Sequence, residues 1–188
     1  MTLPRFYPIF DDVAWLRRML PLGVKLVQMR LKDKPQEDLR AQLREARDLC
    51  AAHGAVLVIN DHWQLAIELG CDWVHLGQED LDEADVTAIR AAGLKLGIST
   101  HDKAELARAL ALQPDYIALG PIYPTILKKM KWHQQGIEKL CVWKALVGDI
   151  PLVAIGGMST ERAPGAFEAG SLHDDPEGRI RDWLEVCG

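Results

Sequence analysis

Short apolar runs alternate with segments of helical periodicity along the chain. The apolar run Val56–Ile59 is followed by the amphipathic segment Trp63–Leu69 and then by a second short apolar run, Trp73–His75. A short apolar run bounded by turn residues is typical of a buried strand, whereas apolar positions three or four apart are typical of an amphipathic helix. This pattern predicts two strands joined by one helix, and such a crossover makes the two strands parallel.

The same unit recurs from one end of the chain to the other. Apolar runs predict strands at residues 6–10, 24–29, 56–59, 73–75, 95–98, 116–119 and 152–155. Helical periodicity is found in the segments between them, and segments 161–169 and 177–186 follow the last run. Strictly alternating strands and helices indicate a parallel sheet covered by helices. The architecture expected is a β/α barrel formed as a single domain by residues 1–188.

The chain departs from a complete eight-fold barrel after its seventh unit. Following Gly170, the residues Ser-Leu-His-Asp-Asp-Pro lead into the helical segment 177–186 with no apolar run between them. A strand alone takes about 5–6 residues, so this connection is too short to cross a sheet and enter a helix. We therefore expect an α/β fold of the (β/α)8 TIM-barrel type whose eighth strand is missing from this sequence. Either the barrel is open, or the complete chain carries a segment that this one lacks.

Composition and charge exclude several classes of partner. A hydrophobic fraction of 48% with 26% charged residues is ordinary for a soluble globular protein. The net charge of −5 argues against a nucleic-acid partner, although a few local cations could still bind a small anion. No apolar run approaches the ~18 residues of a membrane span, and no secretory signal pattern is present. The four cysteines form no C-x-x-C pair, so we expect reduced thiols in a cytoplasmic protein.

Two acidic residues follow neighbouring strands. Asp61 comes directly after the run at residues 56–59, and Asp80 closes the turn after residues 73–75. Since parallel strands end at the same rim, these carboxylates should converge there. Two carboxylates suit Mg²⁺, which leaves its other positions to water and phosphate. The alternative is that each aspartate caps the start of a helix.

Basic side chains follow the second predicted strand. Alternation in an extended segment sends Gln28, Arg30 and Lys32 to the same side. A forked guanidinium beside a compact ammonium makes a good phosphate clamp. The alternative is a solvated strand exit.

The remaining strand ends carry further candidates. Ser99 could donate its hydroxyl to an anion or could cap the following helix. Thr125 and Lys128 lie in the long connection 120–136 and suit an anionic group, although a solvated loop would also hold lysines. Gly157 in a Gly-Gly pair allows backbone N–H groups to approach a phosphate closely, or simply forms a tight turn.

Together these motifs resemble the thiamine-phosphate synthase family, whose fold is a β/α barrel. The likeness covers nearly the whole chain, and its motifs are QMRLK at 28–32, IND at 59–61, HLGQED at 75–80, GIS at 97–99, GPIYPT at 120–125 with Lys128, and AIGG at 154–157. The resemblance implies a Mg-dependent transferase of thiamine biosynthesis. It would join 4-amino-2-methyl-5-(diphosphooxymethyl)pyrimidine to 4-methyl-5-(2-phosphooxyethyl)thiazole, releasing pyrophosphate by a dissociative route. Its partners would be these small phosphorylated substrates, and a homo-oligomer is left open.

The resemblance also implies roles for particular residues. Asp61 and Asp80 would hold Mg²⁺ on the diphosphate. Arg30, Lys32 and Lys128 would be catalytic, because positioned cations stabilise the charge that develops on a departing diphosphate. The residues implied to bind substrate are Gln28, Arg30, Lys32, Asn60, Ser99, Thr125, Lys128 and Gly157. No general base is needed, which agrees with expecting His75 and His101 to be structural or surface residues.

Two features depart from the family pattern. The family loop reads Pro-Thr-x-Thr-Lys, and Leu127 replaces the second threonine here, which removes one hydroxyl. No segment matches the Val-Ser-type end of the eighth strand that holds the thiazole phosphate in the family. Thr125 and Gly157 would then form only part of the site for the thiazole partner.

Two other functions are also considered. A thiazole tautomerase-like relative would share the barrel, but it would have no use for Asp61 and Asp80 beside Arg30, Lys32 and Lys128. A non-catalytic barrel that binds thiamine phosphates as a sensor or carrier is of a different class. The substitution at Leu127 and the missing strand are the only features that support this second alternative.

Overall fold

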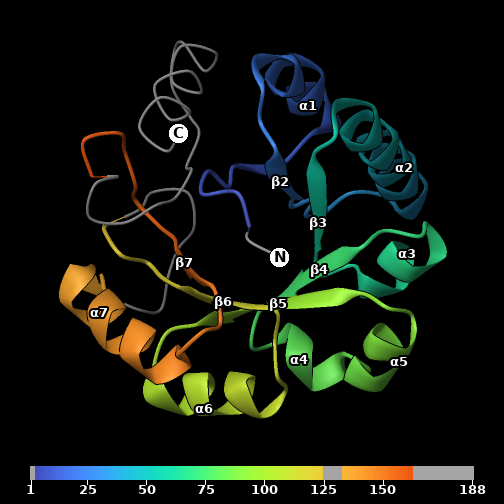
Figure 1. The fold of residues 1–188 in the computed structure, drawn as a ribbon. Coiled ribbons are helices and arrows are strands. Elements are labelled where there is room, and N and C mark those ends of the chain that lie inside the picture. Colours follow the sequence, from blue (N-terminus) through green and yellow to red (C-terminus); the bar gives the residue numbers. More distant parts are fainter. Residues whose placement is uncertain (1–2, 125–132, 163–188) are drawn as a thin grey trace.

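The structure, a computed structural model, describes residues 3–124 and 133–162, whose strands form one parallel sheet (Figure 1). The strands are β1 (Ile9–Phe10), β2 (Leu26–Met29), β3 (Val56–Asn60), β4 (Trp73–Leu76), β5 (Lys95–Thr100), β6 (Tyr116–Leu119) and β7 (Leu152–Ala154). They lie in chain order, and each pairs in parallel with the next. The α/β fold with parallel strands is therefore confirmed. The predicted gap after Gly170 lies outside the described residues.

Helices cover the outer side of this curved sheet (Figure 1). They are α1 (Val13–Met19), α2 (Gln36–His53), α3 (Trp63–Glu68), α4 (Asp80–Glu83), α5 (Val86–Ala91), α6 (Lys103–Ala111) and α7 (Gly136–Val147), with a 3₁₀ turn, η1 (Leu20–Leu22), after α1. The connection between β4 and β5 holds two short helices because Ala84 is extended and Asp85 caps α5 by accepting from the N–H of Ala88 at 2.9 Å. Within the described ranges, none of the helices has both the length and the apolar character required to cross a bilayer.

Strand β1 is shorter than the predicted run at residues 6–10. Pro8 has no N–H to donate, so only its carbonyl joins the ladder, accepting from the N–H of Gln28 at 2.8 Å. The other strands begin or end within a few residues of their predicted bounds.

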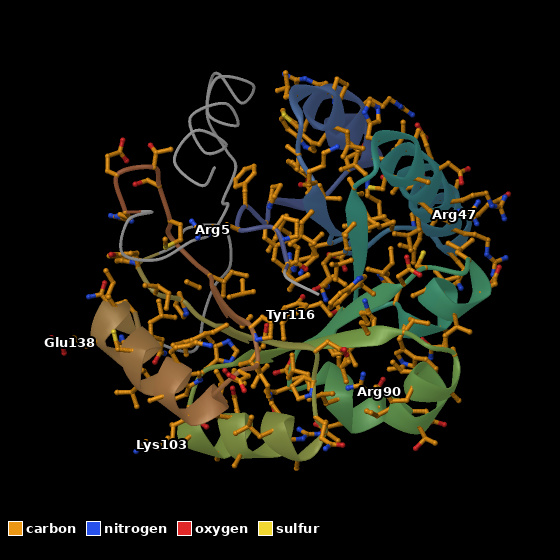
Figure 2. All side chains as sticks on the ribbon, viewed as in Figure 1. Arg5, Arg47, Arg90, Lys103, Tyr116 and Glu138 are labelled. Carbon is orange, nitrogen blue, oxygen red and sulfur yellow. The ribbon has the colours of Figure 1, made fainter. Side chains whose placement is uncertain are left out.

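The two faces of the sheet pack differently. Outward residues such as Val27, Ile59 and Val74 join the main apolar core beneath the helices. Inward residues form a second cluster around Trp73 and Tyr116. Figure 2 places Tyr116 on the inner side, whereas labelled residues of the helices lie at the periphery. The inner face also carries buried polar side chains, and the site develops from them.

Candidate active site

Asp61 is held at the end of β3 by its backbone. Its N–H donates to the carbonyl of His75 at 2.9 Å, and its φ is 64°. The N-cap residue of α3 is His62, with no side-chain cap hydrogen bond. The helix-capping alternative is therefore wrong for Asp61. Its carboxylate instead accepts a hydrogen bond from the Lys32 ammonium and forms an ion pair with it.

Asp80 opens α4 beside this pair. Its Oδ2 accepts from the N–H of Gly77 at 3.0 Å, and a Cβ at Gly77 would lie only 2.8 Å from the same oxygen. Burial raises the pKa of Asp80, and the charge and hydrogen bonding of Asp61 raise it further, while the Gly77 N–H and Lys32 oppose the shift. The structure thus brings Asp61 and Asp80 together on one rim.

This donor set fits a hard divalent cation. Across residues 3–124 and 133–162, no group of three or more His, Cys, Asp or Glu side chains could hold a metal. A two-carboxylate site is what Mg²⁺ takes when substrate phosphate completes its coordination, whereas Zn²⁺ in structural sites takes four protein ligands. A divalent cation would also offset the repulsion that raises the pKa of Asp80. Asp61 and Asp80 as metal ligands stay a prediction.

Residues 28–32 divide between the interior and the rim. Gln28 is only 2% exposed, and its Nε2 donates to Tyr7 Oη at 2.9 Å. Arg30 is half-buried, and its side chain forms no hydrogen bond or ion pair with other described residues. Lys32 is bound to Asp61. The rim therefore presents a guanidinium and an ammonium, and both the phosphate clamp and the solvated strand exit fit this arrangement.

Asn60 occupies the last position of β3 on the inner face. It pairs in register with His75 of β4, and it is 6% exposed. Its side-chain amide forms no hydrogen bond with the part of the chain that the structure describes. Its polar atoms are not among the fully buried ones that lack a partner, so the amide reaches the surface of the rim and is open to a ligand.

Ser99 lies near the end of β5 and is half-buried. Its Oγ is 2.7 Å from His75 Nε2. The capping alternative is wrong for Ser99, because Asp102 caps α6 by accepting from the N–H of Glu105 at 2.9 Å. The serine hydroxyl is thus tied to the inner face of the sheet.

Gly157 follows β7 with φ +70°, in the left-handed region. A Cβ there would lie 2.3 Å from the carbonyl oxygen of Pro124 and 2.7 Å from that of Tyr123. The glycine therefore allows the segments after β6 and β7 to pack closely. This close packing accounts for a glycine at position 157 as well as a phosphate-binding role would. Thr125, Leu127 and Lys128 lie outside the described residues, and their roles stay predictions.

A buried polar chain on the inner face was not identified from the sequence. Tyr7 Oη lies 2.8 Å from Tyr116 Oη, and Tyr116 Oη lies 2.7 Å from His75 Nδ1. Both phenols are buried, and burial raises the pKa of Tyr7 and of Tyr116. One signal was present: Gly97 interrupts a strand, which often marks the close approach of another group. A Cβ at Gly97 would lie 2.0 Å from Tyr116 Cζ.

Known proteins share both the sequence and the fold. The family model described as thiamine monophosphate synthase matches residues 6–171. The chain is 55% identical over 194 residues to the thiamine-phosphate synthase of Rhizobium etli, covering 98% of this chain and 95% of the relative. It is 49% identical over 164 residues to that of an Enterobacter species, covering 87% and 78%.

Solved structures extend the comparison to the backbone. A thiamine phosphate pyrophosphorylase from Pyrococcus furiosus superimposes with a TM-score of 0.85 at 23% identity, covering 98% of this chain and 95% of that one. A 2-keto-3-deoxy-6-phosphogluconate aldolase of Zymomonas mobilis superimposes with a TM-score of 0.70 at 15% identity, covering 98% and 91%. At these identities the likeness is one of fold.

Proposed function

The chain belongs to the thiamine monophosphate synthase family, and on this premise we propose that it makes thiamine phosphate. It would transfer the pyrimidinylmethyl group of a pyrimidine diphosphate to a thiazole phosphate and release pyrophosphate. The observation that carries the proposal is the meeting of Asp61, Asp80 and Lys32 at the carboxyl ends of neighbouring strands. Two carboxylates and an ammonium at one rim suit a diphosphate bound with a divalent cation.

The proposed step breaks one bond and forms another. The C–O bond of the diphosphate ester breaks, and its electron pair leaves with the diphosphate. The thiazole nitrogen then uses its lone pair to form a C–N bond to the pyrimidine methylene. Negative charge grows on the leaving group, where Arg30, Lys32 and Lys128 would stabilise it. Each such contact contributes on the order of 2–4 kcal/mol, and no general base is required.

Mg²⁺ is part of this proposal. Asp61 and Asp80 would hold the ion against the diphosphate. When bound, it would supply positive charge that neutralises the leaving group. The mutual repulsion of the two carboxylates and their adjacent strand ends support this assignment.

Substrate binding would use the remaining rim residues. Asn60 and Ser99 would contact the diphosphate substrate, and Gln28 would lie beside the pyrimidine. Thr125 and Gly157 would meet the thiazole partner. The position of Asn60 at the end of β3, in register with His75, supports the first of these assignments. A cytoplasmic location likewise remains a proposal.

We also propose that the architecture is an eight-fold barrel that lacks its eighth strand. The alignment with the Rhizobium etli relative spans 194 positions, whereas this chain has 188 residues. The relative therefore carries residues inside the aligned region that this chain lacks. The family match ends at residue 171, beside the place where no strand pattern is found.

Release of pyrophosphate tests the function directly. The purified chain is incubated with both substrates, with one substrate omitted, and with or without Mg²⁺. Release that requires both substrates and the metal supports the synthase. Binding of both phosphates without any release would instead favour a carrier, to which Leu127 and the missing strand point. Chelation with EDTA followed by restored Mg²⁺ serves as the control for damage to the protein.

A further inference from the structure

Four side chains connect the interior of the sheet to Ser99 by hydrogen bonds. Gln28 Nε2 donates to Tyr7 Oη at 2.9 Å, Tyr7 Oη lies 2.8 Å from Tyr116 Oη, and Tyr116 Oη lies 2.7 Å from His75 Nδ1. His75 Nε2 is 2.7 Å from Ser99 Oγ. Gln28, Tyr7, Tyr116 and His75 are all at most 5% exposed, whereas Ser99 is half-buried. The chain of contacts therefore runs from the core to the rim.

The direction of these hydrogen bonds follows from counting protons. Tyr7 already accepts from Gln28, and it has one proton to donate. If Tyr116 also donated to Tyr7, the Tyr7 proton would have no acceptor among the described residues. A buried donor without an acceptor is costly. Tyr7 therefore donates to Tyr116, and Tyr116 donates to His75 Nδ1.

The histidine tautomer is then determined. Nδ1 accepts from Tyr116, so in the neutral ring the proton is on Nε2. Nε2–H donates to Ser99 Oγ, which leaves the serine proton available for another acceptor. The tyrosine ring also stacks on the imidazole, with centroids 5.5 Å apart and planes at 16°, which limits rotation of the imidazole ring.

We propose that His75 is a positioning residue: held as its Nε2–H tautomer by Tyr116, it orients Ser99 to donate its hydroxyl proton to the anionic substrate. The inference rests on the proposed function, in which Ser99 meets the diphosphate substrate. Gly97 belongs to the same arrangement, because any side chain there would displace the Tyr116 ring. His75 itself touches no reacting atom in this scheme, and it acts through Ser99.

The tautomer can be measured without substrate. In ¹⁵N NMR of the imidazole side chains, the wild-type protein should show His75 protonated at Nε2 and unprotonated at Nδ1. The His75 signals are assigned by their loss in His75→Asn. In Tyr116→Phe the Nδ1–H form should gain population, because the donor to Nδ1 is gone. A wild-type Nδ1–H tautomer, or a ratio unchanged by Tyr116→Phe, overturns the proposal.

Kinetics give the second readout. Tyr116→Phe and His75→Asn should each raise KM for the diphosphate substrate about tenfold, a change of about 1.4 kcal/mol, with a smaller effect on kcat. Adding Ser99→Ala to either variant should cause little further loss, since the effects of coupled residues do not add. Fully additive losses would overturn the proposal. His53→Asn, in the last turn of α2, is the matched control and should leave KM unchanged.

Two outcomes separate this inference from the proposed function. If wild-type protein releases no pyrophosphate but shows the Nε2–H tautomer and its response to Tyr116→Phe, the function fails and the hydrogen-bond directions stand. If wild-type protein releases pyrophosphate but its His75 is protonated at Nδ1, the proposed function stands and the positioning role of His75 fails. If thermal unfolding shows that Tyr116→Phe does not fold, Tyr7→Phe is used in its place: Tyr116 keeps its proton for His75 Nδ1, so the Nε2–H tautomer should persist, and its replacement by the Nδ1–H form would overturn the proposal.

Discussion

At the scale of single residues, the surroundings of Asp80 disfavour its charged form. Burial raises its pKa, and the neighbouring Asp61 raises it further. The ionised carboxylate is therefore less stable in the folded protein than in the unfolded chain. Such a group binds a cation well, and it destabilises the fold when the cation is absent.

We expect Asp80→Asn to stabilise the metal-free protein near neutral pH. Burial and the neighbouring Asp61 hold the pKa of Asp80 above its ordinary value in the folded protein. Between the unfolded and the folded pKa the folded state therefore binds more protons, and the free energy of unfolding falls as pH rises through this range. Asparagine does not ionise, so Asp80→Asn should remove the part of this pH dependence that Asp80 causes. Thermal unfolding in EDTA from pH 4 to 8 measures the pH dependence in both proteins. Glu83→Gln, exposed on the same helix, is the control, and an equal slope in wild type and Asp80→Asn would contradict the expectation.

The same change should greatly reduce turnover. Asp80→Asn or Asp80→Ala should reduce pyrophosphate release by ~10²-fold or more, as losing one transition-state contact does. Stabilisation of the protein by Mg²⁺ and pyrophosphate should vanish with it. Turnover equal to that of the wild type would remove Asp80 from the proposed metal site.

The three thiols that the structure describes should divide into two classes. Burial raises the pKa of Cys50 to about 12 and that of Cys71 to about 11, whereas Cys141 is exposed on α7. Because the thiolate is the reactive form, we expect iodoacetamide at pH 8 to label Cys141 quickly and the two buried thiols only after unfolding. Peptide mapping by mass spectrometry distinguishes the sites. Rapid labelling of Cys50 in the folded protein would contradict this.

At the scale of elements, the segment that follows β5 is held by hydrogen bonds at the start of α6. Asp102 caps α6 through the N–H of Glu105, and Glu105 in return accepts from the N–H of His101 at 2.7 Å. These two bonds satisfy donors at the start of the helix that carries the chain away from Ser99. The cap therefore helps to hold the rim in place.

Removing the cap should weaken the fold measurably. We expect Asp102→Ala to lower the free energy of unfolding by about 0.5–2 kcal/mol, because a helix-start donor loses its partner. Urea denaturation followed by circular dichroism measures the difference. Lys103→Ala, exposed at the first position of α6, should change it by far less, and equal losses would show that the cap does not matter.

The Tyr116 ring of β6 packs against Gly97 of β5, where no side chain is present. A Cβ at Gly97 would lie 2.0 Å from Tyr116 Cζ and 2.2 Å from its Cε1. We expect Gly97→Ala to destabilise the protein by about 1–3 kcal/mol through overpacking. In the background of Tyr116→Ala the same change should cost much less, since the clash is gone. Equal costs in the two backgrounds, measured by urea denaturation, would contradict the steric account.

At the scale of the whole molecule, the parallel order of the strands assembles the site. In the part of the chain that the structure describes, seven parallel strands in chain order bring their carboxyl ends to one rim of the sheet. Residues far apart in sequence, such as Lys32 and Asp61, can therefore form an ion pair there.

Restoring the residues that the Rhizobium etli relative carries and this chain lacks should improve both stability and binding. We expect insertion of the relative's additional segment at its aligned position to raise the melting temperature and to lower KM for the thiazole phosphate about tenfold or more, an effect expected of one regained polar contact to an anion. A glycine-serine segment of equal length is the control. No difference between the two insertions would contradict the proposed missing strand. The intact mass, compared with 21.0 kDa, verifies the starting material.

The sequence alone was enough for the arrangement of elements and for the acidic pair. Periodicity identified each strand, because burial on both faces of a parallel sheet requires continuous apolar runs. The convergence of Asp61 and Asp80 followed from topology, since parallel strands must end at one rim. Motifs resembling a known family pointed to the reaction, and the family was confirmed.

Only the tertiary structure decided which side chains meet. Tyr7 and Tyr116 are 109 residues apart, and His75 and Tyr116 are 41 apart, yet each pair forms a hydrogen bond. Periodicity shows which face a side chain occupies, but the partner across the sheet depends on register and curvature, which arise from the packing of the whole fold. For this reason the burial of Gln28 and the bond from His75 to Ser99 were not deduced from the sequence.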